Sequence, residues 1–220
     1  MAKSTLLKSS IARKVVMALS GLFLMLFLAQ HFFINMTSVV SPDTFNEISH
    51  FMGYNPLVQY VIQPILIIGV IVHFIMGIVL ELQNRAARPI GYASFNGAAN
   101  SSWSSRNMIY TGAVVFAFLG LHFYDFWFPE IAYKYVDAGA LEPTRYFAEL
   151  QHKFVSPVRT GLYCISFVLL ALHLWHGFSS SFQSIGARKV SVGTRAFGHA
   201  FAIVIPLGFI FIALFHHFNH

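Results

Sequence analysis

Hydrophobic residues in this chain are gathered into five long runs that are separated by short polar segments. Each run is long enough to cross a hydrocarbon core of about 30 Å as a helix that rises about 1.5 Å per residue. The runs are too long and too continuous for the strands of a membrane barrel, and helices satisfy their own backbone hydrogen bonds in lipid. The pattern predicts an all-α membrane protein of one domain, with five transmembrane helices at approximately 15–36, 57–82, 107–128, 160–180 and 197–216.

The composition agrees with a chain whose solvent is the lipid bilayer. Of its 220 residues, 56% are hydrophobic and 10% are charged, whereas a soluble domain carries about 25% charged residues. The net charge of +6 does not indicate nucleic-acid binding, because the basic residues stand in short clusters beside the apolar runs. The single cysteine, Cys164, excludes a disulfide framework and an all-cysteine iron–sulfur site within this chain.

The charges at the ends of the runs predict an orientation. One set of ends is strongly basic, with Lys3, Lys8, Arg13, Lys14, Arg85, Arg88, Arg106, Arg188, Lys189 and Arg195. The opposite set mixes both signs, with Lys134, Arg145, Lys153 and Arg159 beside Asp43, Glu47, Glu130, Asp137, Glu142 and Glu149. Because Lys and Arg accumulate on the cytoplasmic side, we expect a cytoplasmic N-terminus and an external C-terminus. The longest outer segment, 129–158, is expected to hold a surface helix or an ordered cap.

Four of the eleven histidines lie in four successive runs, and their depths match in pairs. His31 and His122 stand about 8 and 9 Å from the outer ends of their runs, at about 1.5 Å per residue. His73 and His173 stand about 14 and 10 Å from the inner ends. Since ionisable residues inside a membrane are costly and are commonly functional, the sequence predicts one outer and one inner histidine pair.

Two imidazoles at one depth on neighbouring helices are suited to bind the two faces of one haem iron. A zinc site would need three or four ligands close together, and each level offers two. Gly69 and Gly77 flank His73 at i−4 and i+4, and Gly177 follows His173 at i+4, so we expect these positions to admit a flat ring. The competing interpretation is that the histidines and glycines only mark close helix crossings.

Further polar residues lie close to these histidines in the sequence. His176 follows His173 by three residues, which makes it a substitute ligand or a hydrogen-bond donor. Glu81 ends the second run, and Asp125 follows His122 by three residues. Both carboxylates are open to two interpretations, as interfacial structure or as parts of a proton route.

Short motifs accompany the four histidines along almost the whole chain. SSIARK at 9–14 and ALSGLF at 18–23 precede His31, and Asn35 follows it. Later come His73-Phe-Ile-Met-Gly77, Leu121-His122 and His173-Leu-Trp-His-Gly177. No motif is strong alone, but the ordered set resembles the cytochrome b subunit of succinate dehydrogenase and fumarate reductase, in its single-chain, five-helix, two-haem form.

This resemblance implies a function and a set of partners. The chain would be the di-haem anchor of respiratory complex II, in the cytoplasmic membrane of a bacterium, and would transfer electrons between an iron–sulfur subunit and a quinone, usually menaquinone. Succinate or fumarate chemistry would take place in the partner subunits, of which one is a flavoprotein with FAD. The family pairing would place His31 and His122 on the distal haem b, and His73 and His173 on the proximal haem b, in agreement with the depths above.

The resemblance also directs attention to residues around the haems and the quinone. Haem propionates are anionic, and the inner-side candidates to bind them are Ser20, Trp103, Arg106, His176 and Arg188. A quinone belongs in an apolar cleft with few polar groups, for which the outer-side candidates are Glu47, His50, Gln59 and Gln63. Ordinary loop polarity explains the second set equally well.

Three other functions are compatible with the same pattern. The first is the cytochrome b anchor of another quinone-linked dehydrogenase, such as a hydrogenase or a formate dehydrogenase. The second is a metal or proton transporter lined with histidines, which would need acceptors spread along one pore. The third is an anchor without haem that binds quinone directly.

Overall fold

The computed structural model describes residues 9–87, 103–137, 139, 142–186 and 191–220. Among these residues the regular structure is helical and no strand is present. Five segments are long and apolar enough to cross a membrane, namely Ser10–Val40, Val58–Ala86, Met108–Tyr135, Pro157–Ser184 and Val192–Phe218. The prediction of an all-helical chain with five apolar helices that could span a membrane is therefore confirmed, and each helical segment continues past the C-terminal end of the apolar run that predicted it.

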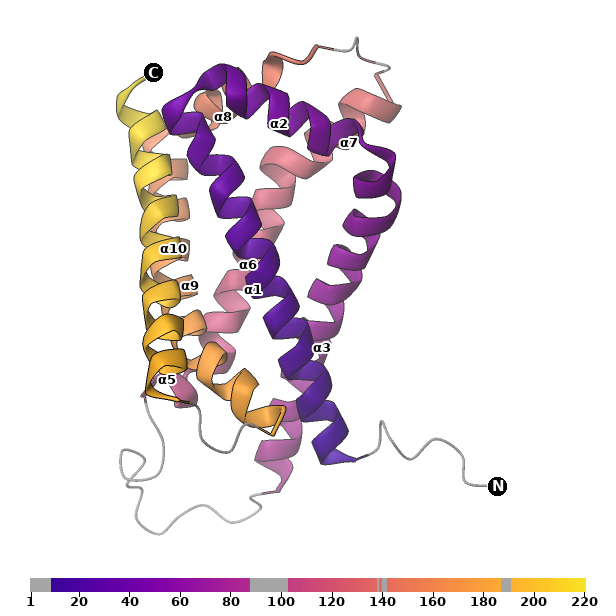
Figure 1. Ribbon diagram of the computed structural model, residues 1–220, viewed down its shortest axis with the longest axis vertical. Helices are drawn as coiled ribbons and strands as arrows, with labels where there is room; N and C mark the ends of the chain where they lie inside the picture. The colour runs from indigo at the N-terminus through magenta and orange to yellow at the C-terminus, as the bar shows by residue number, and fades with distance from the viewer. Residues whose placement is uncertain (1–8, 88–102, 138, 140–141, 187–190) are drawn as a thin grey trace.

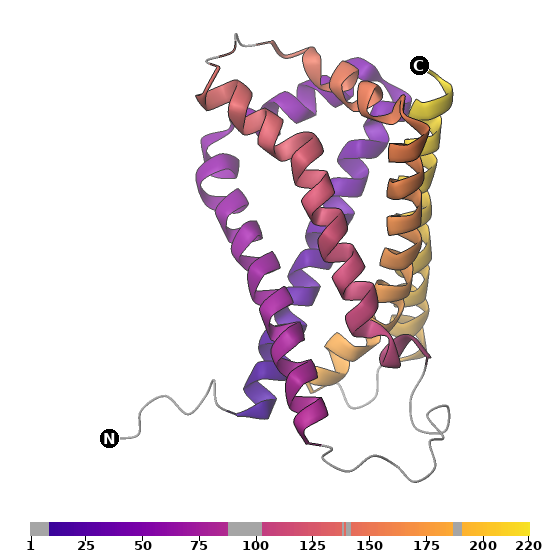
Figure 2. The same ribbon diagram turned by 180° about the vertical axis from the view of Figure 1, so that it is seen from behind.

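The long helices run back and forth along one axis, and two short helices lie across one end (Figure 1). In chain order the elements are α1 (Ser10–Val40), α2 (Pro42–Tyr54), the π-helical turn η2 (Val58–Ile62), α3 (Gln63–Ala86), α5 (Trp103–Arg106), α6 (Met108–His122), the π-helical turn η3 (Phe123–Trp127), α7 (Phe128–Tyr135), α8 (Arg145–Phe154), α9 (Pro157–Ser184) and α10 (Val192–Phe218). Both views show α9 and α10 side by side (Figure 2). Helices α2 and α8 form the cap at the end where the C-terminus lies.

Each π-helical turn precedes a proline by a few residues. Pro64 has no N–H, and in an α-helix its ring would meet the carbonyl of Tyr60, four residues earlier. Tyr60 lies within η2. Asp125, which is likewise four residues before Pro129, lies within η3. We infer that the wider turn accommodates the proline, so that the helix continues without a break.

Serine residues fix where four of the helices begin. The side chains of Ser9, Ser41, Ser156 and Ser191 accept hydrogen bonds from backbone N–H groups in the first turns of α1, α2, α9 and α10. Such bonds satisfy donors that have no partner within the helix. These caps set the register of the spans relative to the loops.

A buried apolar cluster joins α1, α2, α8, α9 and α10 in the half of the bundle next to the cap. It comprises Phe32, Phe45, Leu150, Phe154, Tyr163, Phe167, Ile205, Phe209, Ile212 and Ala213. Gly208 of α10 allows the ring of Phe32 of α1 to lie close to the helix backbone, because a Cβ at Gly208 would lie 2.2 Å from Cε2 of Phe32. By contrast, α3 has no fully buried residue, and its side chains are half-buried or exposed.

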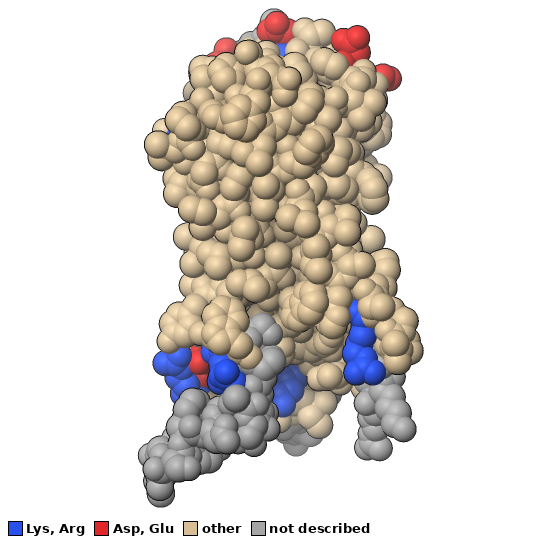
Figure 3. Space-filling view, turned by 90° about the vertical axis from the view of Figure 1, so that its left-hand side faces the viewer, with Lys and Arg blue, Asp and Glu red and all other residues tan. Residues whose placement is uncertain are grey.

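Charged side chains lie at the two ends of the molecule, and an uncharged band separates them (Figure 3). Of the predicted basic set, Arg13, Lys14, Arg85, Arg106 and Arg195 belong to the end opposite the cap. Lys3, Lys8, Arg88, Arg188 and Lys189 lie outside the described residues. This separation of charge is the pattern that the positive-inside rule uses.

The cap contains more helix than the apolar pattern predicted. The third span does not end near residue 128 but continues as α7 to Tyr135. The following segment contains the surface helix α8, and α2 is a further helix that the sequence analysis did not anticipate. Both α2 and α8 have one apolar face that packs on the bundle, through Phe45 and through Leu150 and Phe154.

Candidate functional site: two histidine pairs

The four membrane histidines come together in two pairs. His31 of α1 lies beside His122 at the end of α6, with ring centroids 5.7 Å apart and ring planes at 87°. His73 of α3 lies beside His173 of α9, with ring centroids 6.3 Å apart and planes at 74°. Each pair joins two different helices, so that four spans contribute one imidazole each.

The separations within the pairs suit two ligands on opposite sides of one metal. An imidazole nitrogen binds a metal at about 2.0–2.1 Å and lies about 1.1 Å from its own ring centroid, so two such rings have centroids about 6.3 Å apart. A direct N–H···N hydrogen bond of about 2.9 Å would bring the centroids to about 5 Å. The 6.3 Å of the inner pair equals the first value, and the 5.7 Å of the outer pair lies between the two values. The inner pair therefore fits an iron held between two imidazoles, and the outer pair would reach that separation with a shift of about 0.6 Å.

A hydroxyl group fixes the tautomer of His73. The Ser20 hydroxyl donates its proton to the carbonyl of Met17 at 2.9 Å, and its oxygen lies 3.2 Å from Nδ1 of His73. Because a hydroxyl has a single proton, the Ser20 oxygen accepts from Nδ1–H. The lone pair of this imidazole is then on Nε2, where it is available to a metal.

His173 is held in the same way from a different helix. The Thr111 hydroxyl donates to the carbonyl of Met108 at 3.0 Å and lies 3.4 Å from Nδ1 of His173. The same reasoning leaves the lone pair of His173 on Nε2. Both imidazoles of the inner pair are thus oriented by an outer partner, as is usual for histidines that bind metals.

A glycine follows each of these hydroxyl residues and makes room for the ring. A Cβ at Gly21 would lie 3.3 Å from Cε1 of His73, and a Cβ at Gly112 would lie 3.4 Å from Cε1 of His173. In both dipeptides, Ser20-Gly21 and Thr111-Gly112, the hydroxyl contacts Nδ1 of an imidazole and the glycine leaves room for the same ring. A hydroxyl residue followed by glycine inside an apolar run is a signal that the sequence analysis missed.

The glycines chosen from the sequence have other neighbours. A Cβ at Gly69 would lie 2.9 Å from Cε1 of Phe23, and at Gly77 it would lie 3.8 Å from Cε of Met17. At Gly177 it would lie 3.4 Å from Cε of Met108. These glycines admit apolar side chains from neighbouring helices, whereas the glycines against the histidine rings belong to α1 and α6.

The outer pair has aromatic surroundings. Phe27 stacks on the ring of His31 with centroids 5.4 Å apart, and Phe126 lies 5.2 Å from the ring of His122. Asn35 donates to the backbone carbonyl of His31 at 2.8 Å and lies 3.4 Å from both ring nitrogens. Among the described residues, Nδ1 of His122 is buried without a hydrogen-bond partner. Such a buried atom without a partner is costly.

A buried charged cluster lies next to the outer pair. Asp125 in η3 is 1% exposed and forms an ion pair with Arg159. Its second oxygen accepts from the hydroxyl of Tyr163 at 2.8 Å, and the ring of Tyr163 lies 6.4 Å from that of His122. Asp125 was left open as interfacial structure or as part of a proton route. Its contacts favour the structural role, because Arg159 compensates its charge and both partners belong to α9, so that Asp125 joins α9 to the third span.

The predicted propionate partners are distributed over the basic end. Ser20 bonds to His73, as described above. Trp103 and Arg106 are exposed on α5, and His176 is half-buried one turn after His173 on α9. Arg188 lies outside the described residues.

The predicted quinone residues lie at the cap end but in different settings. Glu47 is exposed on α2, and His50 stacks on Tyr54 with centroids 4.7 Å apart. Gln63 is the first residue of α3. Gln59 of η2 donates to the carbonyl of Met52 at 2.8 Å and lines a cavity.

A site formed by several protein ligands has no support in the part of the chain that the structure describes. No group of three or more His, Cys, Asp or Glu residues is placed there to hold a metal ion. Two imidazoles per site would leave the remaining iron positions to a macrocycle, which is the arrangement in haem proteins. Comparisons with models of protein families, with curated proteins and with solved structures found no match to this chain.

Proposed function

We propose that this chain is the di-haem cytochrome b membrane anchor of a succinate:quinone oxidoreductase, either a succinate dehydrogenase or a fumarate reductase. The observation that carries the proposal is the meeting of four intramembrane imidazoles in two pairs, with ring centroids 5.7 and 6.3 Å apart. His31 and His122 would hold the distal haem b, and His73 and His173 the proximal haem b. When bound, the haems supply one-electron redox chemistry.

The chain's own residues would bind, orient and shield these groups. Ser20 and Thr111 would hold a proton at Nδ1 of each inner imidazole and so leave Nε2 available to the haem iron. The aromatic rings around His31 and His122 exclude water from the outer site. Burial and ligand orientation are the means by which a protein sets the potential of a haem.

The proposed partners follow from the resemblance and agree with the charge pattern. A flavoprotein with FAD and an iron–sulfur protein would dock at the basic end, which the positive-inside rule assigns to the cytoplasm of a bacterium. The dicarboxylate chemistry would belong to those partners. The membrane substrate would be a quinone, with menaquinone as the type that the resemblance implies.

The alternative functions differ in what they require of the bundle. An anchor of a hydrogenase or formate dehydrogenase would use the same histidine pairs, so the subunits that copurify with the chain decide between these cases. A metal or proton transporter would need polar groups along one path. The aromatic setting of the outer pair disfavours such a path.

Difference spectra of membranes that contain single-histidine variants test the proposal. His73→Ala and His173→Ala should each remove the spectrum of the proximal haem, and His31→Ala should remove that of the distal haem. His152→Ala, at an exposed position of α8, is the matched control and should leave both spectra unchanged. Full haem content in the three membrane variants would refute the assignment.

A further inference from the structure

A groove of about 560 Å³ runs between α1 and α10 towards the end of the bundle opposite the cap, and the last turns of α9 form its third side. We propose that this groove binds one acyl chain of an anionic phospholipid, whose headgroup lies beside Lys14 and Arg195. The inference uses the charge of the bundle and its five apolar helices that could span a membrane, and it does not depend on haem.

The groove exists because α1 and α10 pack closely only near the cap. There the ring of Phe32 lies against Gly208, where a Cβ would be 2.2 Å from Cε2 of that ring. From this contact the two helices diverge towards the basic end (Figures 1 and 2). Helix α10 stays close to α9 instead, because a Cβ at Gly198 would lie 2.2 Å from Cδ1 of Phe178. The space that remains lies between α1 and the pair of α9 and α10.

The walls of the groove offer no free polar group to a ligand. On the side of α1 they consist of Leu22, Met25, Leu26 and Ala29. Among the described residues that line the groove, Thr194 alone has a polar side chain, and its hydroxyl lies 2.8 Å from that of Ser191. Burial of a polar group without a partner is costly, so the part of a ligand that lies in the groove is a hydrocarbon.

A row of aromatic rings forms the wall opposite α1. The ring centroid of Phe178 lies 5.0 Å from that of Phe182 and 5.9 Å from that of Phe197. Phe197 is followed by Phe201 at 6.4 Å. These rings give a continuous apolar surface from α9 to α10, against which a flexible chain can make many dispersion contacts.

The length of the groove suits an acyl chain of one leaflet. Its wall runs from Leu22 to Ala29 on α1 and from Gly193 to Phe201 on α10, which corresponds to about 10 and 12 Å along the helix axes. One leaflet contributes about 15 Å of a hydrocarbon core of about 30 Å. A helix of another protein would cross the whole core and is about 10–12 Å wide, so the groove fits a lipid chain better than a helix.

Positive charge lies at the end of the groove that faces away from the cap. The three helices that form the groove contain no Asp or Glu. Lys14 precedes Met25 by eleven residues, which is three helical turns, so both belong to one face of α1. Arg195 follows in the first turn of α10, and both cations are exposed. Basic residues beside a membrane-spanning segment attract anionic lipids.

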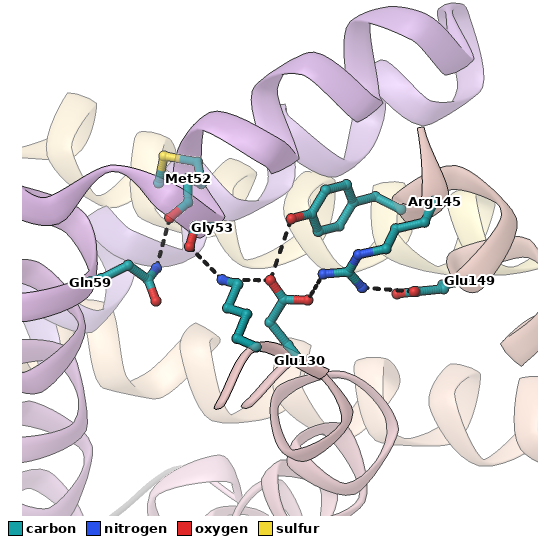
Figure 4. Close-up of polar contacts among 8 residues, drawn as sticks. Met52, Gly53, Gln59, Glu130, Arg145 and Glu149 are labelled. Carbon is teal, nitrogen blue, oxygen red and sulfur yellow. Dashed lines mark hydrogen bonds and ion pairs between the residues drawn. The ribbon is translucent and has the colours of Figure 1, made fainter. Parts of the chain in front are cut away.

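The main cations of the cap are compensated, in contrast to these two. Glu130 forms ion pairs with Lys134 and Arg145, and Glu149 pairs with Arg145 (Figure 4). In the described parts of the chain, no ion pair includes either of the two cations beside the groove. The charge at the groove is therefore available to an anionic headgroup, and the basic end of Figure 3 is where that headgroup would lie.

Native mass spectrometry of the purified full chain in detergent, with dioleoyl phosphatidylglycerol or dioleoyl phosphatidylcholine added, tests the charge. The unaltered chain should bind one phosphatidylglycerol more tightly than phosphatidylcholine. Lys14→Gln and Arg195→Gln should each reduce this preference about fivefold. Arg85→Gln is the matched control, because Arg85 lies at the same end on α3 and pairs with Glu81, and it should retain the preference.

Filling the groove tests the place of the acyl chain. A Cβ at Gly193 would meet Oγ of Ser191 at 3.9 Å, which is an ordinary contact, so Gly193→Leu adds its side chain to open space in the groove. Binding of phosphatidylglycerol should weaken about tenfold, because fewer methylene groups of the lipid are buried. Ala196→Leu is the matched control, since Ala196 is exposed on the same helix and outside the groove wall.

The outcomes separate this inference from the proposed function. Equal affinity of the unaltered chain for the two lipids would overturn the inference, as would unchanged binding in Gly193→Leu or an equal loss in Ala196→Leu. A dimer that Gly193→Leu abolishes would assign the groove to a second copy of the chain and would also overturn it. If Gly193→Leu does not fold, the glutamine variants decide. A chain that binds the lipid as expected but contains no haem would contradict the proposed function alone.

Discussion

Replacing Ser20 by alanine removes the group that orients His73, and the structure gives the size of the effect. The hydroxyl lies 3.2 Å from Nδ1 of His73, and a neutral hydrogen bond contributes about 0.5–1.5 kcal/mol. For a one-electron couple about 1.4 kcal/mol corresponds to about 60 mV. If the bond forms fully in one oxidation state only, the potential shifts by about 20–60 mV.

The sign of this shift follows from the direction of the hydrogen bond. The Ser20 oxygen accepts from Nδ1–H, which makes the imidazole a stronger donor to iron and favours the oxidised metal. Ser20→Ala should therefore raise the potential of the proximal haem and leave the distal one unchanged. Thr111→Val should have the same effect, because Thr111 holds His173 in the same way.

A redox titration followed by absorption resolves the two haems in the purified protein. Ser38→Ala is the matched control, since Ser38 lies on the same helix and bonds to His216 at 2.9 Å instead of to the inner pair. The reasoning is refuted if Ser20→Ala leaves the proximal potential unchanged, or if Ser38→Ala shifts it equally. Retention of the original potential in Ser20→Thr would show that the hydroxyl, and not the shape of serine, is responsible.

Two further predictions concern packing and charge. Arg159→Leu leaves the carboxylate of Asp125 buried with Tyr163 as its remaining partner, so unfolding in mixed micelles should show a loss of about 3–5 kcal/mol. Adding Asp125→Asn should recover most of this loss, and a double variant no more stable than Arg159→Leu would count against a buried ion pair. Gly112→Val places a branched side chain where a Cβ is already 3.4 Å from His173, and difference spectra should show loss of the proximal haem with the distal one retained; two intact spectra would show that the contact is unimportant.

The spans and the histidine pairs were predictable because the rise of a helix is fixed. Depth could be counted along each run, and His31 and His122, like His73 and His173, do meet across the bundle. Spacing on one helix could not show which neighbouring helix each ring touches. The glycines against the rings therefore had to be found in the structure, where Gly21 belongs to α1.

The cap was less predictable, because its helices depend on contacts distant in sequence. Helix α2 is short and mixed in polarity, and it is held by the Asn46 side chain, which accepts from the backbone N–H of Phe147 at 2.8 Å. A proline inside a helix commonly kinks or breaks it, whereas the π-helical turns before Pro64 and Pro129 allow both spans to continue. Of the four outer polar residues chosen from the sequence, Gln59 lines the cavity, because η2 directs it there.

The ratio of haem to protein in the purified chain tests the central claim most directly. A pyridine haemochrome measurement on the protein from membranes should give two haem b per chain, and the His31→Ala and His73→Ala variants should each give one. A colourless protein, or a ratio that does not change in either variant, would contradict the account.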